Sequence, residues 1–320
     1  MPMFITQESI HAKGRMMKNF NNEAYKYLAS DLIGDIFYAE TSYRGKISEV
    51  RQYAEVIVRK ILDINPDEKV TLGEKEIKNR ICALPNHAFL MKAVNTIKGA
   101  GDKATHTRYL ARMTEEEFET IMDSLFDMLA FLLINYFEVY EFGSRNDVLS
   151  SFSMLPPIIR YKVLSFLYEK NPDNVVVIDK LVLAILKAFD ADEANAWIEE
   201  REWELRQKST MTKEFKDGIM QKFEDEEELS LLLEMIGPQN MYELCKRKVE
   251  KVGNAIEQIG SLYLDFESAL PVYKENGVLK GTEPEIQEFN DIMEFLYLGR
   301  KEKVKKICNE PLLFIMNMFS

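Results

Sequence analysis

One stretch of this sequence gathers side chains that could do chemistry. Residues 95–110, NTIKGAGDKATHTRYL, hold two glycines, two lysines, a histidine and an arginine between long apolar segments. Such a stretch could form a catalytic loop, a loop that cradles phosphate, or a turn. The P-loop spacing of glycines and a GK pair is missing from GAGDKAT. A catalytic loop or a turn remains, with Gly99 ending a helix and Gly101 permitting the turn.

Helical patterns precede this stretch. Residues 46–64 place apolar side chains at alternating steps of three and four, which predicts a helix with one apolar stripe. Lys60 is predicted to lie mainly off this stripe. An earlier helix is predicted over residues 22–39 and a short one between residues 72 and 84. NHAFLMKAVNTIK then predicts a helix that begins after Asn86, as its N-cap, and ends at Gly99.

The helix that follows the stretch is the most apolar of the chain. Thr114 and Glu117 have the spacing of a capping box, and acidic residues fill the first turn, as suits a helix N-terminus. Residues 125–137 are apolar on nearly every face, which predicts a central place in the fold. This segment contains Asp127 and is shorter than the roughly 20 residues that span a bilayer. We interpret it as a core helix and expect no membrane contact.

The composition favours an all-α fold. The 320 residues are 46% apolar and 29% charged, and they include only fourteen glycines and ten prolines, as expected of a soluble, helix-rich protein. A break rich in Gly, Ser and Pro at residues 143–157 places a boundary between an N-terminal bundle, residues 1–145, and a second helical domain, residues 146–320. Residues 175–178 are β-branched and could form a strand instead of a helix. Helices are predicted over residues 158–168, 175–189, 191–207, 212–223, 225–236, 241–264, 284–298 and 301–316.

Charge and cysteine usage narrow the class of protein. The net charge of −12 argues against a surface covered with phosphate-binding groups, although a local basic groove stays open. Cys82, Cys245 and Cys308 are widely spaced, and we interpret them as buried, reduced thiols of a cytoplasmic protein. The N-terminal segment lacks the apolar run of a signal peptide. No His/Cys pair has zinc spacing, so we expect neither a metal nor another cofactor.

The succession of an amphipathic helix, a short helix, the glycine-containing stretch and a long apolar helix resembles the HEPN superfamily. The likeness is to members of unknown function found in restriction and phage-defence proteins. The family pattern I-R-x-x-G-N-x-A-x-H aligns with Ile97–His106, and the resemblance covers about residues 41–140. It implies an N-terminal HEPN-like bundle. Many members of this family are metal-independent endoribonucleases, often with the active site across a dimer interface. The resemblance implies the same activity for this chain.

The resemblance also implies roles for single residues. His106 would be the acid/base, since an imidazole of ordinary pKa moves protons at neutral pH without a metal. Lys98 stands at the family's arginine position and Asp102 at its asparagine, which completes the catalytic set. Lys103 and Arg108 would contact RNA phosphate. Seven residues separate Lys98 from His106.

Two functions follow as alternatives. The first is an antiviral-defence or toxin-type protein that cleaves or binds RNA. The second is a non-catalytic assembly or sensor subunit, a homodimer or a partner of another protein in a defence complex. The histidine and the glycine stretch favour the first, whereas the net acidity and the missing arginine favour the second. Trp197 and Trp203 are expected in the core, with one of them as an alternative partner anchor.

Overall fold

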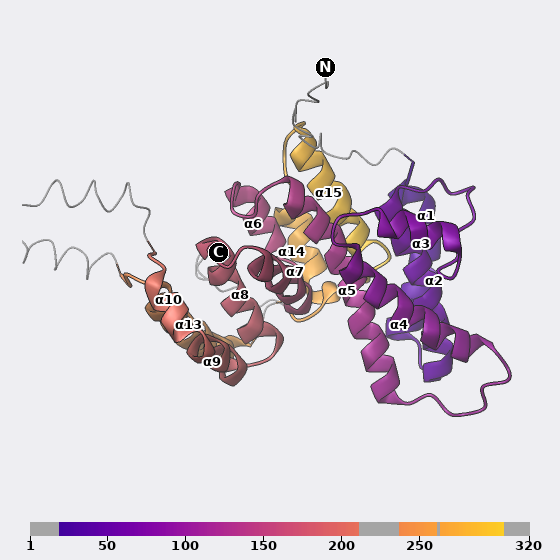
Figure 1. Ribbon diagram of the computed structural model, residues 1–320, viewed down its shortest axis with the longest axis horizontal. Coiled ribbons are helices and arrows are strands. Elements are labelled where there is room, and N and C mark those ends of the chain that lie inside the picture. The colour runs from indigo at the N-terminus through magenta and orange to yellow at the C-terminus, as the bar shows by residue number, and fades with distance from the viewer. Residues whose placement is uncertain (1–18, 211–236, 261–262, 304–320) are drawn as a thin grey trace, which may run out of the picture.

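The computed structural model describes residues 19–210, 237–260 and 263–303. Within these residues every regular element is a helix, apart from an isolated bridge between Ser209 and Asn240, so the predicted all-α fold is confirmed (Figure 1). The helices predicted over residues 212–223 and 225–236, and most of that predicted over 301–316, lie outside the described residues.

The helices of the first half form a bundle around α5. They are drawn from indigo to magenta in Figure 1, and α2, α4 and α5 pack against one another. Their bounds are α1 (Asn22–Ile33), the π-helical turn η1 (Gly34–Tyr38), α2 (Tyr43–Leu62), α3 (Lys75–Cys82), α4 (His87–Thr105) and α5 (Glu115–Val139).

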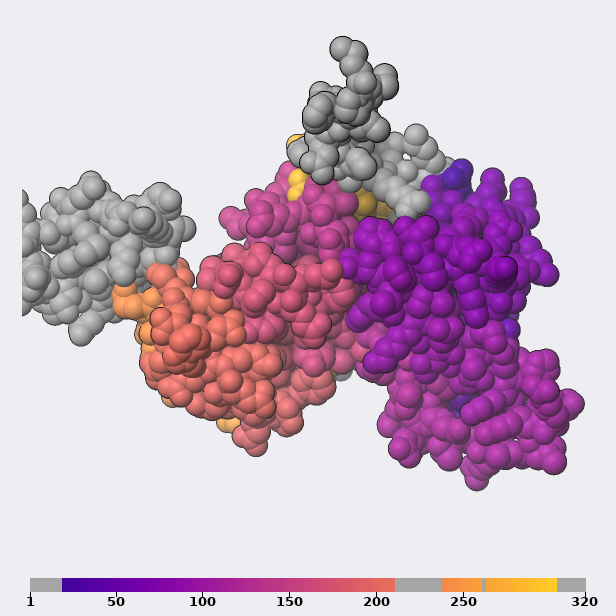
Figure 2. All heavy atoms as spheres, in the orientation of Figure 1, coloured from indigo at the N-terminus to yellow at the C-terminus, as the bar shows by residue number. Residues whose placement is uncertain are grey.

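Helices α7 to α13 lie on the other side of α5 from α2 and α4 (Figure 1). The hairpin of α7 and α8 packs beside α5, and α9, α10 and α13 lie beyond it at the far end of the molecule (Figures 1 and 2). Their bounds are α6 (Asn146–Phe152), α7 (Pro157–Lys170), α8 (Val175–Ala188), α9 (Ala191–Glu200), α10 (Glu202–Gln207), α13 (Met241–Ile259), α14 (Phe266–Val272), the π-helical turn η2 (Tyr273–Gly277) and α15 (Pro284–Tyr297).

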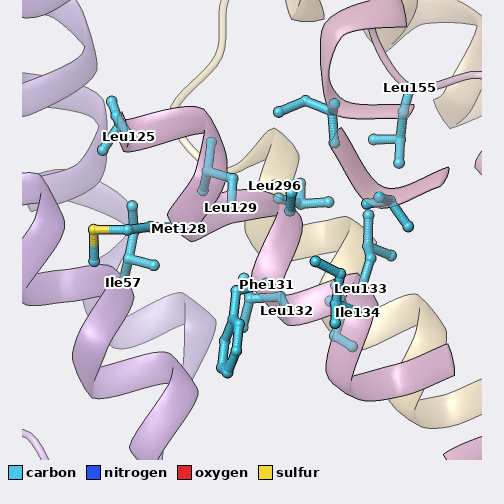
Figure 3. Close-up of a cluster of buried hydrophobic side chains, with 14 of the residues drawn as sticks. Ile57, Leu125, Met128, Leu129, Phe131, Leu132, Leu133, Ile134, Leu155 and Leu296 are labelled. Atoms are coloured by element: carbon cyan, nitrogen blue, oxygen red, sulfur yellow. The ribbon is translucent and has the colours of Figure 1, made fainter. Parts of the chain in front are cut away.

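Helix α5 is the centre of the core, as its apolar sequence predicts. Its side chains meet Ile57 of α2 on one side and Leu296 of α15 on another (Figure 3). The predicted capping box is confirmed, because Thr114 accepts from the Glu117 N–H and Glu117 accepts from the Thr114 N–H. By length and composition α5 could cross a membrane, but 72% of its apolar window is buried inside the protein. This burial is that expected of a core helix.

The C-terminal helix α15 returns to the first half of the chain. It packs against α1 and α5, and Asp291 on α15 accepts a hydrogen bond of 2.6 Å from Lys60 on α2. The prediction that Lys60 lies off the buried stripe is wrong, since its side chain is fully buried. Asn22 of α1 also accepts from the Lys60 ammonium at 3.0 Å. The domain boundary at residue 145 stays a prediction, and buried side chains on both sides of it share one cluster.

Some predicted elements differ in length or type. The β-branched residues 175–178 begin helix α8, whose cap Asn174 accepts from two backbone N–H groups of the first turn, so the helical alternative is confirmed. The break at residues 143–157 contains α6, and Arg201 divides the helix predicted over residues 191–207 into α9 and α10. The helix predicted over residues 241–264 ends at Ile259, before Gly260 at φ 76°.

The cysteines divide between core and surface. Cys245 is buried and Cys82 is exposed, and both are free thiols. Burial was therefore predicted correctly for Cys245 and wrongly for Cys82, which is the last residue of the short helix α3. Cys308 lies outside the described residues.

Candidate functional site

Most of the stretch 95–110 is helical, and only its last five residues lie in a loop. Helix α4 continues through both glycines to Thr105, and His106 is its C-cap. The prediction that α4 ends at Gly99 is therefore wrong, as is a turn at Gly101. A Cβ at Gly101 would lie 2.5 Å from the Arg51 Cδ of α2. The missing side chain lets α2 and α4 approach closely, which is a packing role.

Asp102 is the junction between these two helices. Its Oδ1 atom lies 2.5 Å from Arg51 Nη1 and its Oδ2 atom 2.6 Å from Lys98 Nζ. The hydrogen bond from Lys98 lowers the pKa of Asp102, partial burial opposes this shift, and the charge of Arg51 adds to it. Asp102 is therefore a carboxylate at neutral pH. Lys98 and Asp102 pair within α4, and Asp102 also pairs with Arg51 of α2.

His106 stands apart from this ion-pair cluster. Its backbone N–H donates to the Asp102 carbonyl and its own carbonyl accepts from the Tyr109 N–H. The His106 side chain is exposed. Within the described part of the chain, its ring nitrogens make no hydrogen bond. Lys98 lies eight positions earlier on α4, about 12 Å along the helix axis. Lys98 and Asp102 are paired with each other, and the catalytic role predicted for the three residues stays a prediction.

The segment that joins α4 to α5 carries the remaining predicted residues. We call residues 106–113 the α4–α5 loop, which lies at the lower right edge of Figure 1. Arg108 is exposed on this loop, and Lys103 on the last turn of α4 places its Nζ 5.4 Å from the centre of the Tyr109 ring. Leu110 is 90% exposed. The loop therefore offers an apolar side chain flanked by cations.

Arg44 of α2 holds the loop in place by its backbone. Its guanidinium donates to four carbonyl oxygens, those of Lys103 and Ala104 at the end of α4 and those of Tyr109 and Ala111 in the loop, at 2.7 to 3.2 Å. Helix C-termini leave carbonyls without partners, and a guanidinium can bind several at once. These hydrogen bonds fix the path of the loop.

Sequence reasoning did not identify Arg44 or place Arg51 in the site. The two lie seven positions apart on α2, which is two helical turns, so both face α4. This spacing is visible in the sequence. The spacing indicates that Arg44 and Arg51 share one face of α2, but not which helix covers that face. The residues that contact this face come more than fifty positions later in the chain.

A cleft of about 350 Å³ opens between α2, α4 and α5 beside the loop. Gly99 and Ala100 leave room at its centre, since a Cβ at Gly99 would meet nothing within 4 Å. Ile47 and Ile121 supply apolar walls, and Lys103 with other polar side chains forms the rim. The cleft and the α4–α5 loop are continuous through Lys103 and Met113.

Neither a metal nor a family can be assigned to this site. Within the described ranges, no group of three or more His, Cys, Asp or Glu side chains is arranged to hold a metal ion. Comparisons with protein-family models, with curated proteins and with solved structures gave no match for the chain. The HEPN resemblance therefore stays a prediction from sequence, and any function must be argued from the geometry.

Proposed function

We propose that this chain is a non-catalytic helical subunit that binds another protein through the α4–α5 loop. One observation carries the proposal. Asp102 engages Lys98 and Arg51 in ion pairs of 2.5 to 2.6 Å, so two of the three predicted catalytic groups support the junction of α2 and α4. Among the described residues the His106 ring is hydrogen-bonded to neither of them, so no partner orients it as the acid/base that cleavage of RNA needs.

The exposed chemistry of the loop favours a protein partner over RNA. Leu110 is 90% exposed, and an apolar side chain beside Tyr and Arg is typical of protein interfaces. Exposed Glu115, Glu116 and Glu119 follow on the first turns of α5, so the local field is mixed in sign. The chain carries a net charge of −12, and phosphate backbones are bound by surfaces dense in Lys and Arg.

The sequence resemblance supports a setting for this activity. HEPN-like proteins of the kind that residues 41–140 resemble occur in phage-defence systems, so the proposed partner is another protein of a cytoplasmic defence complex. The alternative protein partner is a second copy of the same bundle, which would make the chain a homodimer. Trp203 is 79% exposed on α10, so the expectation of a buried core position is wrong for this residue, and it could anchor a further contact.

Two variants with the same new charge test the loop. Leu110→Asp and Tyr27→Asp both alter side chains that are at least 84% exposed, but Tyr27 lies on α1 and not on the loop. Tagged chains are recovered from the native host and the co-purifying proteins are quantified. We expect one protein to be lost at least tenfold with Leu110→Asp and retained with Tyr27→Asp. Equal recovery with both variants would contradict the proposal.

A His106→Ala variant tests the competing nuclease. We expect phage protection, growth and cellular RNA integrity to match the wild type, because no hydrogen bond within the described residues orients the imidazole. RNA crosslinking to wild-type chains is measured in parallel. Cleavage of RNA by the wild type that His106→Ala abolishes, or RNA crosslinks at Lys103 and Arg108, would replace the protein-binding proposal by the RNA alternative.

A further inference from the structure

An exposed apolar patch lies between the end of α8 and the end of α13. We call it the α8–α13 patch, and it consists of Phe189, Ile256, Ile259 and Leu264. Phe189, Ile259 and Leu264 are 49%, 53% and 63% exposed, and Ile256 is half-buried. Ile256 and Ile259 lie three positions apart on α13 and so share one face of that helix. Large apolar side chains that gather on a surface mark a place where something binds.

A pocket of about 470 Å³ opens at this patch. Phe189, Ile256 and Leu264 line it, and all three side chains are at least partly exposed. Ala191 and Gly253 also line the pocket, and a Cβ at Gly253 would meet nothing within 4 Å. These small residues leave room for side chains to enter. The pocket is therefore open to solvent and to a segment of chain.

The part of the chain that the structure describes ends beside this pocket. Lys303 is its last residue, and the Lys303 N–H donates to the Glu267 carbonyl at 3.0 Å. The Lys303 ammonium pairs with Asp265, which follows Leu264 directly. Leu264 lines both the pocket at the patch and the neighbouring pocket that Lys303 lines. The residues that follow Lys303 in the sequence thus start next to the patch.

The sequence beyond Lys303 contains an apolar run. Residues 311–319 read PLLFIMNMF, and exposing so many apolar side chains to water is unfavourable. Residues 304–310 can span up to about 25 Å when extended, so the run is able to reach the pocket. A segment tethered in this way has an effective concentration on the order of millimolar. This tether favours the segment over a separate partner.

The charges of the pocket and of the linking residues are opposite in sign. The charged side chains of the pocket wall are Lys187, Asp190, Asp192 and Glu257, so the wall is net acidic. Residues 304–310 are net basic, because Lys305 and Lys306 outnumber Glu310. The attraction between exposed charges is modest. It adds to the apolar contact and favours the same occupant.

We propose that residues 311–319 bind the α8–α13 patch of the same chain and fill its pocket. The apolar side chains of the run pack against Phe189, Ile256 and Leu264, and the patch is thereby closed to other proteins. None of the residues that line this pocket belongs to the α4–α5 loop. The contact is therefore independent of the proposed protein partner.

A photoreactive side chain tests this contact in the full chain. p-Benzoylphenylalanine in place of Phe314 keeps an aromatic ring in the run and crosslinks to nearby C–H bonds on irradiation. Crosslinks are mapped by mass spectrometry in a mixture of unlabelled and isotope-labelled chains, which separates contacts within one chain from contacts between two. We expect crosslinks within one chain, at Phe189, Ile256, Ile259 or Leu264. Crosslinks between two chains would overturn the proposal in favour of a second copy, and crosslinks elsewhere, or none, would overturn it outright.

Matched variants locate the contact at the patch. Ile259 and Val278 are both 53% exposed, but Val278 follows η2 and lines neither pocket. Ile259→Asp should lower the crosslinking yield about tenfold, because it places a charge against apolar side chains, whereas Val278→Asp should leave the yield unchanged. The double variant Leu313→Asp with Ile315→Asp keeps every described side chain and should also abolish crosslinking, which decides the matter if Ile259→Asp does not fold. A yield that survives either change in a folded chain would contradict the proposal.

Discussion

The Arg51 guanidinium of α2 and the Asp102 carboxylate of α4 approach to 2.5 Å across the interface of the two helices. Gly101 makes this approach possible, because any side chain there would collide with Arg51. Asp102, which the family resemblance implies to be catalytic, is therefore part of the interface between α2 and α4.

Replacing Asp102 by Asn should weaken the fold in a pH-dependent way. The folded-state pKa of Asp102 is lowered, so its stabilisation is present above the ordinary carboxyl range and is lost as pH falls through the lowered pKa. At neutral pH we expect the variant to lose about 1 kcal/mol of unfolding free energy. As pH falls below about 4 the difference should shrink, and it should vanish below the lowered folded-state pKa. Urea unfolding of both proteins across this range measures the difference, and a gap that widens in acid would contradict the assignment.

The two glycines of α4 should respond in opposite ways to alanine. Gly101→Ala forces Arg51 aside and should cost about 1–3 kcal/mol of unfolding free energy, as overpacking does. Gly99→Ala meets nothing within 4 Å and should gain about 0.5–1 kcal/mol from helix propensity. Chemical unfolding of the two single variants serves as a matched comparison. Equal effects would show that backbone propensity, and not packing against Arg51, governs both positions.

Removing the carboxylate of Asp291 should destabilise the fold strongly. The Lys60 ammonium is fully buried and relies on Asp291 and Asn22, so Asp291→Ala should cost about 3–5 kcal/mol of unfolding free energy. Burial lowers the pKa of Lys60. The unfolded state then holds the proton more strongly, and stability rises as pH rises from the folded-state pKa towards the unfolded one.

The defect of Asp291→Ala should therefore shrink at alkaline pH. The double variant Lys60→Met with Asp291→Ala is its control, since an apolar pair removes the buried charge and should recover part of the loss. Thermal and urea unfolding of the three proteins measure these differences. A double variant that is less stable than Asp291→Ala would show that the lysine stem, and not its charge, matters.

Features encoded by near neighbours could be predicted from the sequence. Thr114 and Glu117 are three positions apart and form their capping box, and the apolar run of residues 125–137 becomes the core of α5. Local spacing determines these features, and the packing of the fold agrees with it. The all-α class follows from many such segments together.

Features that depend on distant residues could not be predicted in this way. Gly99 and Gly101 have the local signature of a helix end, yet α4 continues because it packs on α2 and Asp102 finds Arg51 there. Lys60 is buried because Asp291, 231 positions away, supplies its counter-charge. The buried Arg300 guanidinium likewise packs on rings from η1 and α14. Periodicity along one helix holds no information about such partners.

The hydrogen bonds of Arg44 to the α4–α5 loop and to the last turn of α4 are all accepted by backbone carbonyl oxygens. Every amino acid has such an oxygen, so the anchor does not depend on which side chains the loop displays. Residues 107, 108 and 110 are therefore free to change during evolution while the loop keeps its course. A scaffold of this kind can acquire a new binding specificity by substitution at the loop surface, without redesign of the helices beneath it.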